Sequence, residues 1–205
     1  TNGEDKRSLW TYDIEKKIFL EKIYGDKEAD LSGVFYHYDF FNYPDQMIGV
    51  RTSKSKPKRI YFSSELASSA KLTQEQIEKV IPNSYTTYIS ALSKDLNSMV
   101  IYNTGPKDPG SYYLLKNGKI SFIGSKRPSF KAKDLADVKY LKYTSRDGRT
   151  IPAYVTIPKG KGPFPLIVNP HGGPFVSETT TWDTWSQLLA NHGYMVIQPQ
   201  YRGST

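Results

Sequence analysis

A short segment near the end of the chain has the residue types and the spacing needed to bind an oxyanion. Asn169-Pro170-His171-Gly172-Gly173-Pro174 directly follows the apolar run Leu166–Val168. Two adjacent glycines give the backbone φ values closed to other residues and let a substrate approach the peptide N–H groups without an intervening Cβ. Fixed N–H groups aimed at a developing oxyanion stabilise the tetrahedral intermediate of acyl transfer, each by on the order of 3 kcal/mol. The segment therefore predicts an oxyanion loop.

The competing interpretation is an ordinary strand-to-loop turn, since Gly172, Gly173 and Pro174 are common turn residues and His171 would then cap the strand. The surroundings favour the oxyanion loop. An apolar strand precedes the segment and a helical pattern follows it, which is where α/β-hydrolases carry a histidine-glycine loop that donates one oxyanion N–H. Enzymes with parallel sheets also place their active-site loops outside the carboxyl ends of the strands.

The elements around the loop are predicted to form a βαβ unit. Leu166–Val168 and residues 194–197 are short apolar runs of the kind found in fully buried strands. Between them lies an amphipathic helix that ends at His192-Gly193, with its apolar residues on one side: Trp185, Leu188 and Leu189, with Trp182 as a further candidate. Upstream, residues 138–144 and 151–157 flank a Gly-containing turn at 146–149 and predict a hairpin. We interpret residues 131–205 as the start of an α/β domain.

Residues 1–130 carry a different pattern, made of short β-type runs separated by turns, which is typical of an all-β sandwich, barrel or propeller. At about 40 to 45 residues for each four-stranded blade, the region has room for roughly three blades. One helix is expected as an insertion, beginning with a capping box at Thr73 and Gln76 and ending before Pro82. The pair Asn117-Gly118 predicts a tight hairpin turn. The fold class is therefore mixed, with β-propeller blades followed by the N-terminal part of an α/β-hydrolase domain.

The composition narrows the functional classes. A net charge of +8 invites a nucleic-acid reading, but the lysines are scattered and the densest basic cluster, residues 54–59, has the composition of a solvated loop. Nucleic acid is therefore not an expected partner. No apolar run is long enough to cross a bilayer, and the polar start of the chain lacks a signal-type segment. The chain has no cysteine, which fits a soluble protein of either the cytoplasm or the periplasm. We expect no metal site and no cofactor.

Two longer stretches of the sequence resemble a known protein family. Residues 166–174 and 187–205, the latter ending Gln198-Pro199-Gln200-Tyr201-Arg202-Gly203-Ser204-Thr205, resemble the start of the catalytic domain in the acylaminoacyl-peptidase and dipeptidyl-peptidase branch of the prolyl oligopeptidase family. Residues 143–154 resemble the first hairpin of that domain, and residues 108–114 resemble a strand of the β-propeller that precedes it. The resemblance implies a serine peptidase that hydrolyses short peptides, with residues 1–130 as the last propeller blades and residues 131–205 as the start of the hydrolase domain.

By this resemblance Gly173 gives the oxyanion N–H, while His171 and Gly172 hold the loop in shape. Family members carry their nucleophile in a Gly-x-Ser-x-Gly elbow, followed by an aspartate and a histidine, and this chain has no such elbow. The nucleophile, acid and base are therefore expected beyond Thr205, and residues 1–205 alone are expected to be inactive. Ser204 is rejected as the nucleophile because a base within hydrogen-bond reach is required. The remaining histidines, His37 and His192, are assigned to a β strand and a helix end.

Arg202 has two interpretations, because it follows a buried strand close to the oxyanion loop. It pairs with a carboxylate of the fold, or it binds a substrate carbonyl and is then a substrate-binding residue. Two other functions stay open for the whole chain. One is a carboxylesterase of the same fold, which Pro174 and the upstream β region disfavour. The other is a non-catalytic β-propeller binding module. An oligomer is compatible with the sequence.

Overall fold

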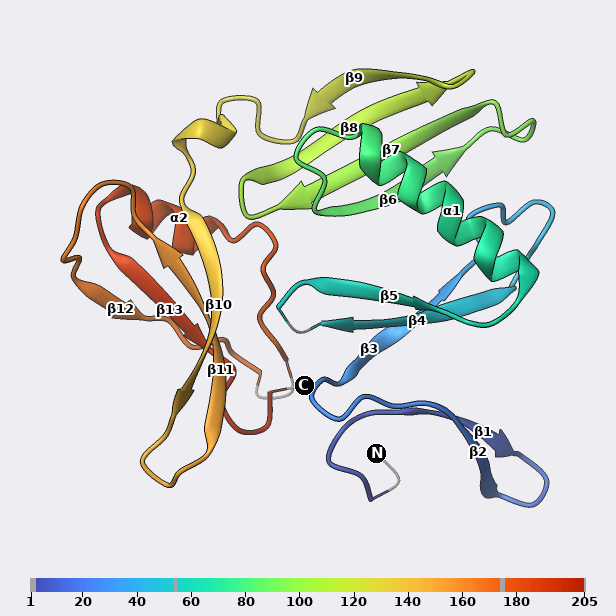
Figure 1. The fold of residues 1–205 in the computed structure, drawn as a ribbon, viewed down its shortest axis with the longest axis horizontal. Helices are drawn as coiled ribbons and strands as arrows, with labels where there is room; N and C mark the ends of the chain where they lie inside the picture. The colour runs from blue at the N-terminus through green and yellow to red at the C-terminus, as the bar shows by residue number, and fades with distance from the viewer. Residues whose placement is uncertain (1–2, 54, 174–175, 205) are drawn as a thin grey trace. The chain divides into compact units, whose positions relative to one another are not determined.

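The computed structural model describes residues 3–53, 55–173 and 176–204, and within these ranges the chain is mostly β-sheet with two α-helices and one short 3-10 helix (Figure 1). The chain divides into two compact units, Thr1–Lys71 and Leu72–Ser204. Helix α1 (Glu65–Val80) begins in the first unit and ends in the second. Neither α-helix combines the length and the apolar character needed to cross a bilayer, as judged over the described ranges.

The first unit holds two antiparallel sheets. Strands β1 (Leu9–Asp13) and β2 (Ile18–Tyr24) pair with each other, and β3 (Leu31–Tyr36), β4 (Met47–Ser53) and β5 (Pro57–Tyr61) form a sheet in that order. The apolar core of the first unit lies between the three-stranded sheet and the start of α1. It contains four buried residues, Phe35, Ile48, Ala67 and Ala70. The basic cluster is only partly a loop, because Lys58 and Arg59 lie on β5; Lys54 is outside the described residues.

Helix α1 starts nine residues earlier than the capping box predicted, with its cap at Ser64 instead of Thr73. Ser64 caps it, since its hydroxyl oxygen accepts a hydrogen bond from the Ala67 N–H at 3.1 Å. Thr73, the expected cap, lies inside the helix. The prediction failed because residues 65–72 have few large apolar side chains, and their small buried alanines leave no strong periodic signal.

The second unit contains a four-stranded antiparallel meander, β6 (Thr86–Leu92), β7 (Ser98–Gly105), β8 (Asp108–Lys116) and β9 (Lys119–Ser125). The end of α1 packs on it through a buried cluster of Ile77, Ile81, Ile101 and Tyr113. The predicted hairpin turn is confirmed, since Asn117 and Gly118 both have positive φ values between the paired residues Lys116 and Lys119. This meander has the strand count of one blade, whereas the two preceding sheets are smaller, and no closed propeller forms within the described residues.

A buried polar network fixes one end of the meander. The amide of Asn103, which is fully buried, donates to Asp108 at 2.7 Å and accepts from the Thr87 hydroxyl at 2.8 Å and from the Tyr85 N–H at 3.0 Å. Asp108 also accepts from the Gly110 N–H at 2.9 Å. Because buried polar groups must be satisfied, this network ties strands β6, β7 and β8 into one register at that end.

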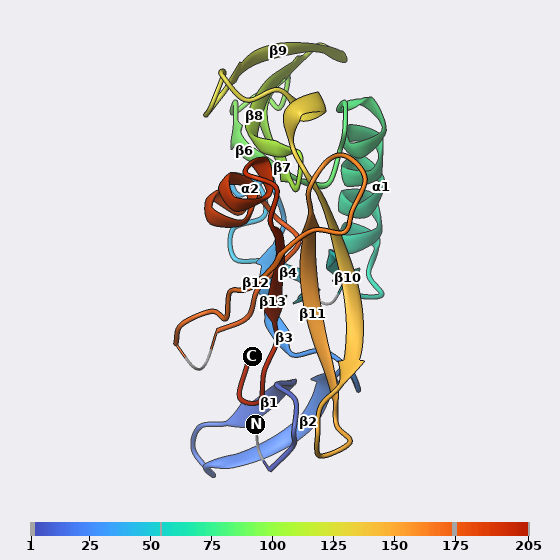
Figure 2. The same ribbon diagram turned by 90° about the vertical axis from the view of Figure 1, so that its left-hand side faces the viewer.

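The same unit contains a mixed sheet in the order β10-β11-β13-β12, formed by β10 (Asp137–Thr144), β11 (Thr150–Ile157), β12 (Leu166–Val168) and β13 (Met195–Pro199). The hairpin of β10 and β11 is confirmed. Strands β12 and β13 are parallel and are joined through α2 (Thr184–Asn191), which packs against β13 and β11 (Figure 2). The predicted βαβ unit is therefore present.

The buried side of α2 differs from the predicted one. Ser186, Gln187 and Ala190 are buried, whereas Trp185 is 68% exposed and Leu188 is 46% exposed. Polar partners explain the inversion, since the Ser186 hydroxyl donates to the buried Gln198 side chain of β13 at 3.0 Å. A hydrogen-bonded polar side chain can face the sheet at little cost, so apolar periodicity alone assigned the wrong face.

Candidate oxyanion site

The candidate site lies where two parallel strands end. Strand β12 pairs with β13 in parallel, and the Asn169 N–H continues the ladder by donating to the Ile197 carbonyl at 2.9 Å. The chain that leaves β12 at Asn169 and the chain that leaves β13 at Gln200 therefore emerge at the same edge of the sheet. This edge is the position at which open α/β sheets bind their ligands.

His171 is held by contacts on three sides. Its Nδ1 lies 2.8 Å from the Gly172 carbonyl oxygen, and its Nε2 lies 2.8 Å from the Ser204 hydroxyl. The Tyr201 ring stacks on the imidazole at 4.4 Å between centroids, and the Tyr201 hydroxyl donates to the His171 carbonyl at 2.6 Å. The histidine thus links the loop after β12 to the chain after β13.

Gly173, the predicted oxyanion donor, has a left-handed backbone conformation and is exposed. Its φ is +121°, a value that L-residues with a side chain rarely adopt, and the residue is exposed. Among the residues that the structure describes, none accepts a hydrogen bond from the Gly173 N–H. Gly172 is also exposed, with no atom within 4 Å of the position that a Cβ would take. Pro174, the last residue of the predicted loop, is outside the described residues.

A tight turn brings Ser204 back to the histidine. The Ser204 N–H donates to the Tyr201 carbonyl at 3.0 Å, and Gly203, the third residue of the turn, has a φ of +88°. Arg202, the second residue, is not among the residues with a positive φ, so the turn is of type II. The sequence argument against Ser204 assumed that no base lies within reach, and this reason is wrong, because His171 Nε2 is within hydrogen-bond distance. The contacts of Ser204 and Tyr201 with His171 were not predicted from the sequence. Gly203, soon after a strand, was a signal for a turn that brings the chain back.

A second tie joins the segment after the oxyanion loop to the end of β13. The Gln200 amide accepts from the Glu178 N–H at 3.0 Å and donates to the Glu178 carbonyl at 2.8 Å. Burial, and then the negative charge of Asp183, raise the pKa of the Glu178 carboxyl above its ordinary value, while the electrostatic interaction with His171 and a hydrogen bond with Gln198 act in the opposite direction. Sequence patterns did not indicate this clamp.

Arg202 forms an ion pair. Its Nη2 lies 2.7 Å from an oxygen of Asp147, which belongs to the turn between β10 and β11. A hydrogen bond from Ser145 and the charge of Arg202 lower the pKa of Asp147, so that this carboxyl is ionised at neutral pH. The pairing predicted as one of the two roles of Arg202 is therefore present. The Arg202 side chain is 59% exposed, which leaves it accessible for the substrate-binding role as well.

The other two histidines lie apart from this arrangement. His37, in the first unit, directly follows strand β3 rather than lying within it, is buried, and stacks on Tyr38 at 4.5 Å between ring centroids. Burial lowers the pKa of its imidazole. His192 forms the carboxyl-terminal cap of α2 and is exposed.

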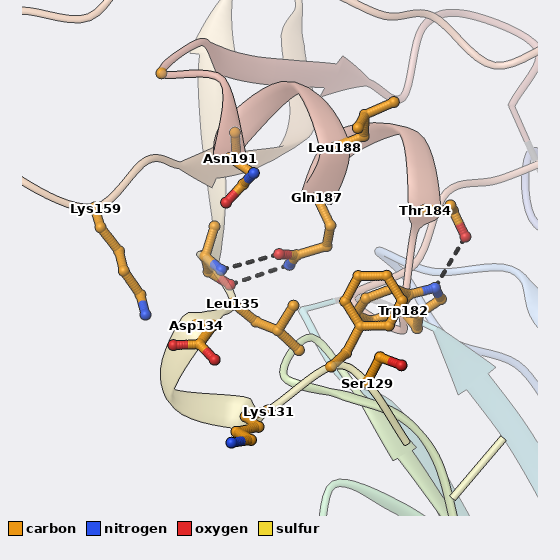
Figure 3. A pocket seen from close by; sticks show the side chains of 14 residues that line it. Ser129, Lys131, Asp134, Leu135, Lys159, Trp182, Thr184, Gln187, Leu188 and Asn191 are labelled. Atoms are coloured by element: carbon orange, nitrogen blue, oxygen red, sulfur yellow. Dashed lines mark hydrogen bonds between the residues drawn. The ribbon is translucent and has the colours of Figure 1, made fainter. Parts of the chain in front are cut away.

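A cavity of about 340 Å³ lies elsewhere in the second unit, between α2 and residues 129–136 (Figure 3). Gln187 forms one wall, with its amide bound to both backbone groups of Ala136 at 2.9 and 3.1 Å and to the Pro106 carbonyl at 3.1 Å. Trp182 forms another wall and donates to Thr184 at 2.9 Å. None of the described oxyanion-loop residues lines this cavity, which therefore lies apart from the site of acyl transfer predicted from the sequence. The hydrogen bonds of Gln187 join the β7–β8 turn and the segment before β10 to α2.

Comparison with solved structures identifies the fold. A prolyl endopeptidase structure matches 96% of this chain with a TM-score of 0.57 at 15% identity, and the puromycin-hydrolysing peptidase of Mycobacterium tuberculosis matches 90% with a TM-score of 0.57 at 18% identity. At these identities the matches show a shared fold, that of the corresponding part of prolyl oligopeptidase-like enzymes. No protein-family model matches the chain.

Sequence relatives lead to the same group. The dipeptidyl aminopeptidase BIII of Pseudoxanthomonas mexicana is 28% identical over 64% of this chain, the dipeptidyl peptidase family member 6 of Caenorhabditis elegans is 23% identical over 100% of it, and the rat acylamino-acid-releasing enzyme is 35% identical over 34%. The chain spans 20%, 30% and 9% of the lengths of these three proteins. Its homologues and structural neighbours are thus peptidases of the prolyl oligopeptidase family, and the resemblance identified from the motifs is confirmed.

Proposed function

We propose that the whole protein is a serine peptidase that cleaves short peptides by acyl transfer, and that residues 169–173 supply part of its oxyanion hole. In this proposal residues 1–130 belong to a β-propeller and residues 131–205 open an α/β-hydrolase domain. The catalytic serine, acid and base lie beyond Thr205, so that residues 1–205 alone are inactive.

The observation that carries the proposal is the state of the Gly173 N–H. Gly173 is exposed, its N–H lacks an acceptor among the described residues, and it lies in a loop at the carboxyl edge of two parallel strands. Its peptide unit is anchored on the opposite side, because the Gly172 carbonyl accepts a hydrogen bond from His171. A fixed, unpaired N–H is the group that an oxyanion requires, since it needs no reorganisation when charge develops.

The relatives support the peptidase class over the esterase. Their names describe dipeptidyl aminopeptidase and acylamino-acid-releasing activities, both of which act on peptides. In the proposed reaction the serine hydroxyl attacks the scissile carbonyl, the serine proton passes to the histidine base, and the resulting oxyanion accepts from the Gly173 N–H. The base then protonates the leaving amine, and water releases the acyl group by the same route.

The test uses the full-length protein with dipeptidyl and acyl-aminoacyl reporters and a serine-directed phosphonate. We expect hydrolysis, inhibition by the phosphonate, and a labelled serine beyond Thr205 when the adduct is mapped by mass spectrometry. The Gly173→Ala variant should lower kcat on the order of 100-fold, because a side chain at φ +121° displaces the loop and its N–H.

Gly193→Ala is the matched control. Gly193 also has a positive φ, +86°, but it lies at the end of α2, away from the loop, and a Cβ there would meet no atom within 4 Å. It should reproduce the backbone strain of Gly173→Ala and leave kcat within about twofold. Equal losses in the two variants would remove Gly173 from the proposed role. Ester reporters hydrolysed in the absence of any peptidase activity would favour the carboxylesterase, and a full-length protein that the phosphonate does not label would favour a binding module.

A further inference from the structure

Ser204 makes a contact that the proposed oxyanion role does not by itself require. Its hydroxyl lies 2.8 Å from Nε2 of His171, a residue 33 positions earlier in the sequence. Tyr201 stacks on the same imidazole and binds the backbone of the same residue. Two residues of one turn, Tyr201 and Ser204, therefore hold His171, with Gly203 supplying the bend.

The ring contacts of His171 select one tautomer. Two of the three meet at Nδ1, because the Tyr201 hydroxyl also lies 3.2 Å from this nitrogen. That hydroxyl gives its one proton to the His171 carbonyl, so towards Nδ1 it can only accept. The Gly172 carbonyl oxygen can only accept a hydrogen bond, so Nδ1 must carry the proton that fills the 2.8 Å contact. In a neutral imidazole Nε2 then has a free lone pair and can only accept. The Ser204 hydroxyl, which donates or accepts by rotation, therefore donates to Nε2. In the other tautomer a nitrogen lone pair would face the carbonyl oxygen at the same distance.

This tautomer controls the direction of the Gly173 N–H. The carbonyl of Gly172 and the N–H of Gly173 belong to one planar trans peptide unit, so they point in opposite directions. Glycines flank this unit on both sides, and without side chains the whole unit can rotate at low cost. The hydrogen bond from His171 Nδ1 holds the carbonyl on one side, and the N–H is consequently held on the other.

We propose that Ser204 is a positioning residue for the oxyanion hole: its hydrogen bond keeps His171 protonated on Nδ1, which fixes the Gly172 carbonyl and so aims the Gly173 N–H at the substrate. The proposal rests on the proposed function of Gly173. Ser204 acts through two other residues and makes no contact with the substrate.

The same 2.8 Å contact would also suit a nucleophilic serine with a histidine base, and the test must separate the two roles. A nucleophile is labelled by the serine-directed phosphonate and cannot be replaced by alanine without loss of all covalent catalysis. A positioning serine is not labelled by the phosphonate. Its replacement lowers kcat by no more than the loss of one oxyanion donor would.

The experiment compares full-length protein carrying Ser204→Ala, Ser204→Thr or Ser111→Ala. Ser111 is the control, because its hydroxyl also makes one hydrogen bond of 2.8 Å in the second unit, to Asp108, on the distant strand β8. We expect Ser204→Ala to lower kcat by about 10- to 100-fold, within the range for a misplaced oxyanion donor, with KM changed by less than about twofold. Ser204→Thr retains the hydroxyl and should recover kcat to within about threefold of wild type, and Ser111→Ala should not change it.

A second readout does not depend on activity. In protein labelled with 15N-histidine, with the His171 signals assigned from a His171→Gln variant, we expect a protonated Nδ1 and an unprotonated Nε2 in the wild type. Ser204→Ala should give a mixture of tautomers, and Ser204→Thr should restore the single form. Protonation of His171 on Nε2 in the wild type, no change in Ser204→Ala, or phosphonate labelling of Ser204 would each overturn the proposal. If the proposed function is wrong, the full-length protein should show no hydrolysis and no labelled serine. The tautomer measurement does not depend on activity, so it would still test the role of Ser204 in the loop.

Discussion

Gln200 binds both backbone groups of Glu178, accepting from its N–H at 3.0 Å and donating to its carbonyl at 2.8 Å. An amide side chain that pairs with a peptide unit in this way imitates one rung of a β-ladder. Together with the contacts between Ser204 and His171, it ties the long segment between β12 and α2 to the end of β13 at two points. The candidate loop is therefore anchored by polar side chains on a neighbouring strand end, although it contributes no strand of its own.

The first prediction concerns this clamp. Gln200→Leu removes both hydrogen bonds to Glu178, each with a net value of about 1 kcal/mol. We expect amide hydrogen exchange at Glu178 to accelerate on the order of 10-fold or more, as measured by mass spectrometry of the full-length protein.

Gln187→Leu is the matched control, since Gln187 makes the equivalent pair of bonds to Ala136. Exchange should accelerate at Ala136 in that variant and stay unchanged at Glu178. Acceleration at both positions in both variants would indicate a general loss of stability and would contradict the clamp.

The second prediction concerns the buried tyrosine of β11. Burial raises the pKa of Tyr154 from 10.0 to about 12, and its exposed fraction is only 2%. Because the folded state binds the phenol proton more tightly than the unfolded state does, this contribution to stability is fully present below pH 10.0 and is lost as the pH rises towards about 12. Two pKa units correspond to about 3 kcal/mol.

We therefore expect the free energy of unfolding to fall between pH 10.0 and about 12, and to fall less steeply in Tyr154→Phe, where no phenol titrates at this position. Denaturant unfolding followed by circular dichroism at several pH values gives both slopes. Identical slopes for wild type and variant would show that another group causes the alkaline transition.

The third prediction separates the two roles of Arg202. If the guanidinium binds a substrate carbonyl while Asp147 holds it in place, Arg202→Met should raise KM by about fivefold, the value of one hydrogen bond, and leave kcat nearly unchanged. Asp147→Asn removes the partner charge and keeps the guanidinium, so its effect on KM should be smaller. Steady-state kinetics of the full-length protein with peptide reporters measure both. An unchanged KM in Arg202→Met would reduce Arg202 to the ion pair alone.

Local patterns predicted most of the strands because those strands alternate or run apolar and end at strong turn residues. The hairpin at Asn117-Gly118 and the parallel pair of β12 and β13 follow from such signals. The failures have a common physical cause. Helix α1 begins with small residues and Ser64 as its cap, and α2 buries Ser186 and Gln187 because each finds a hydrogen-bond partner. Apolar periodicity cannot report burial that hydrogen bonds make possible.

Part of the candidate site could be predicted from local sequence features, and part could not. A loop at His171, Gly172 and Gly173 was predictable, because its glycines and its place after an apolar strand are local features, while its oxyanion role stays a prediction. The contacts of His171 with Tyr201 and Ser204 join positions 30 and 33 residues apart, and they depend on the parallel register of two strands. No single-sequence pattern encodes that register, so the support for the loop became visible only in three dimensions.

The last prediction concerns the edge of the mixed sheet. Strand β12 pairs with β13 on one side and is terminal in the strand order of the described sheet, with Leu166 57% exposed and Val168 60% exposed. An exposed apolar edge strand is a template for pairing with another chain. We therefore expect isolated residues 1–205 to aggregate and Val168→Lys to suppress this, because a charged side chain at an edge opposes strand addition.

Leu72→Lys is the control, since Leu72 is 59% exposed but lies on helix α1, where no backbone groups are free to pair with a strand. Light scattering and sedimentation of the three purified chains measure the difference. If aggregation were driven by exposed apolar area alone, the two lysine variants would improve solubility equally. If it proceeds through the β12 edge, Val168→Lys should raise the monomer fraction well above that of Leu72→Lys. If the wild-type segment stays monomeric and unfolds in a sharp, reversible transition, the expectation that residues 1–205 aggregate is wrong.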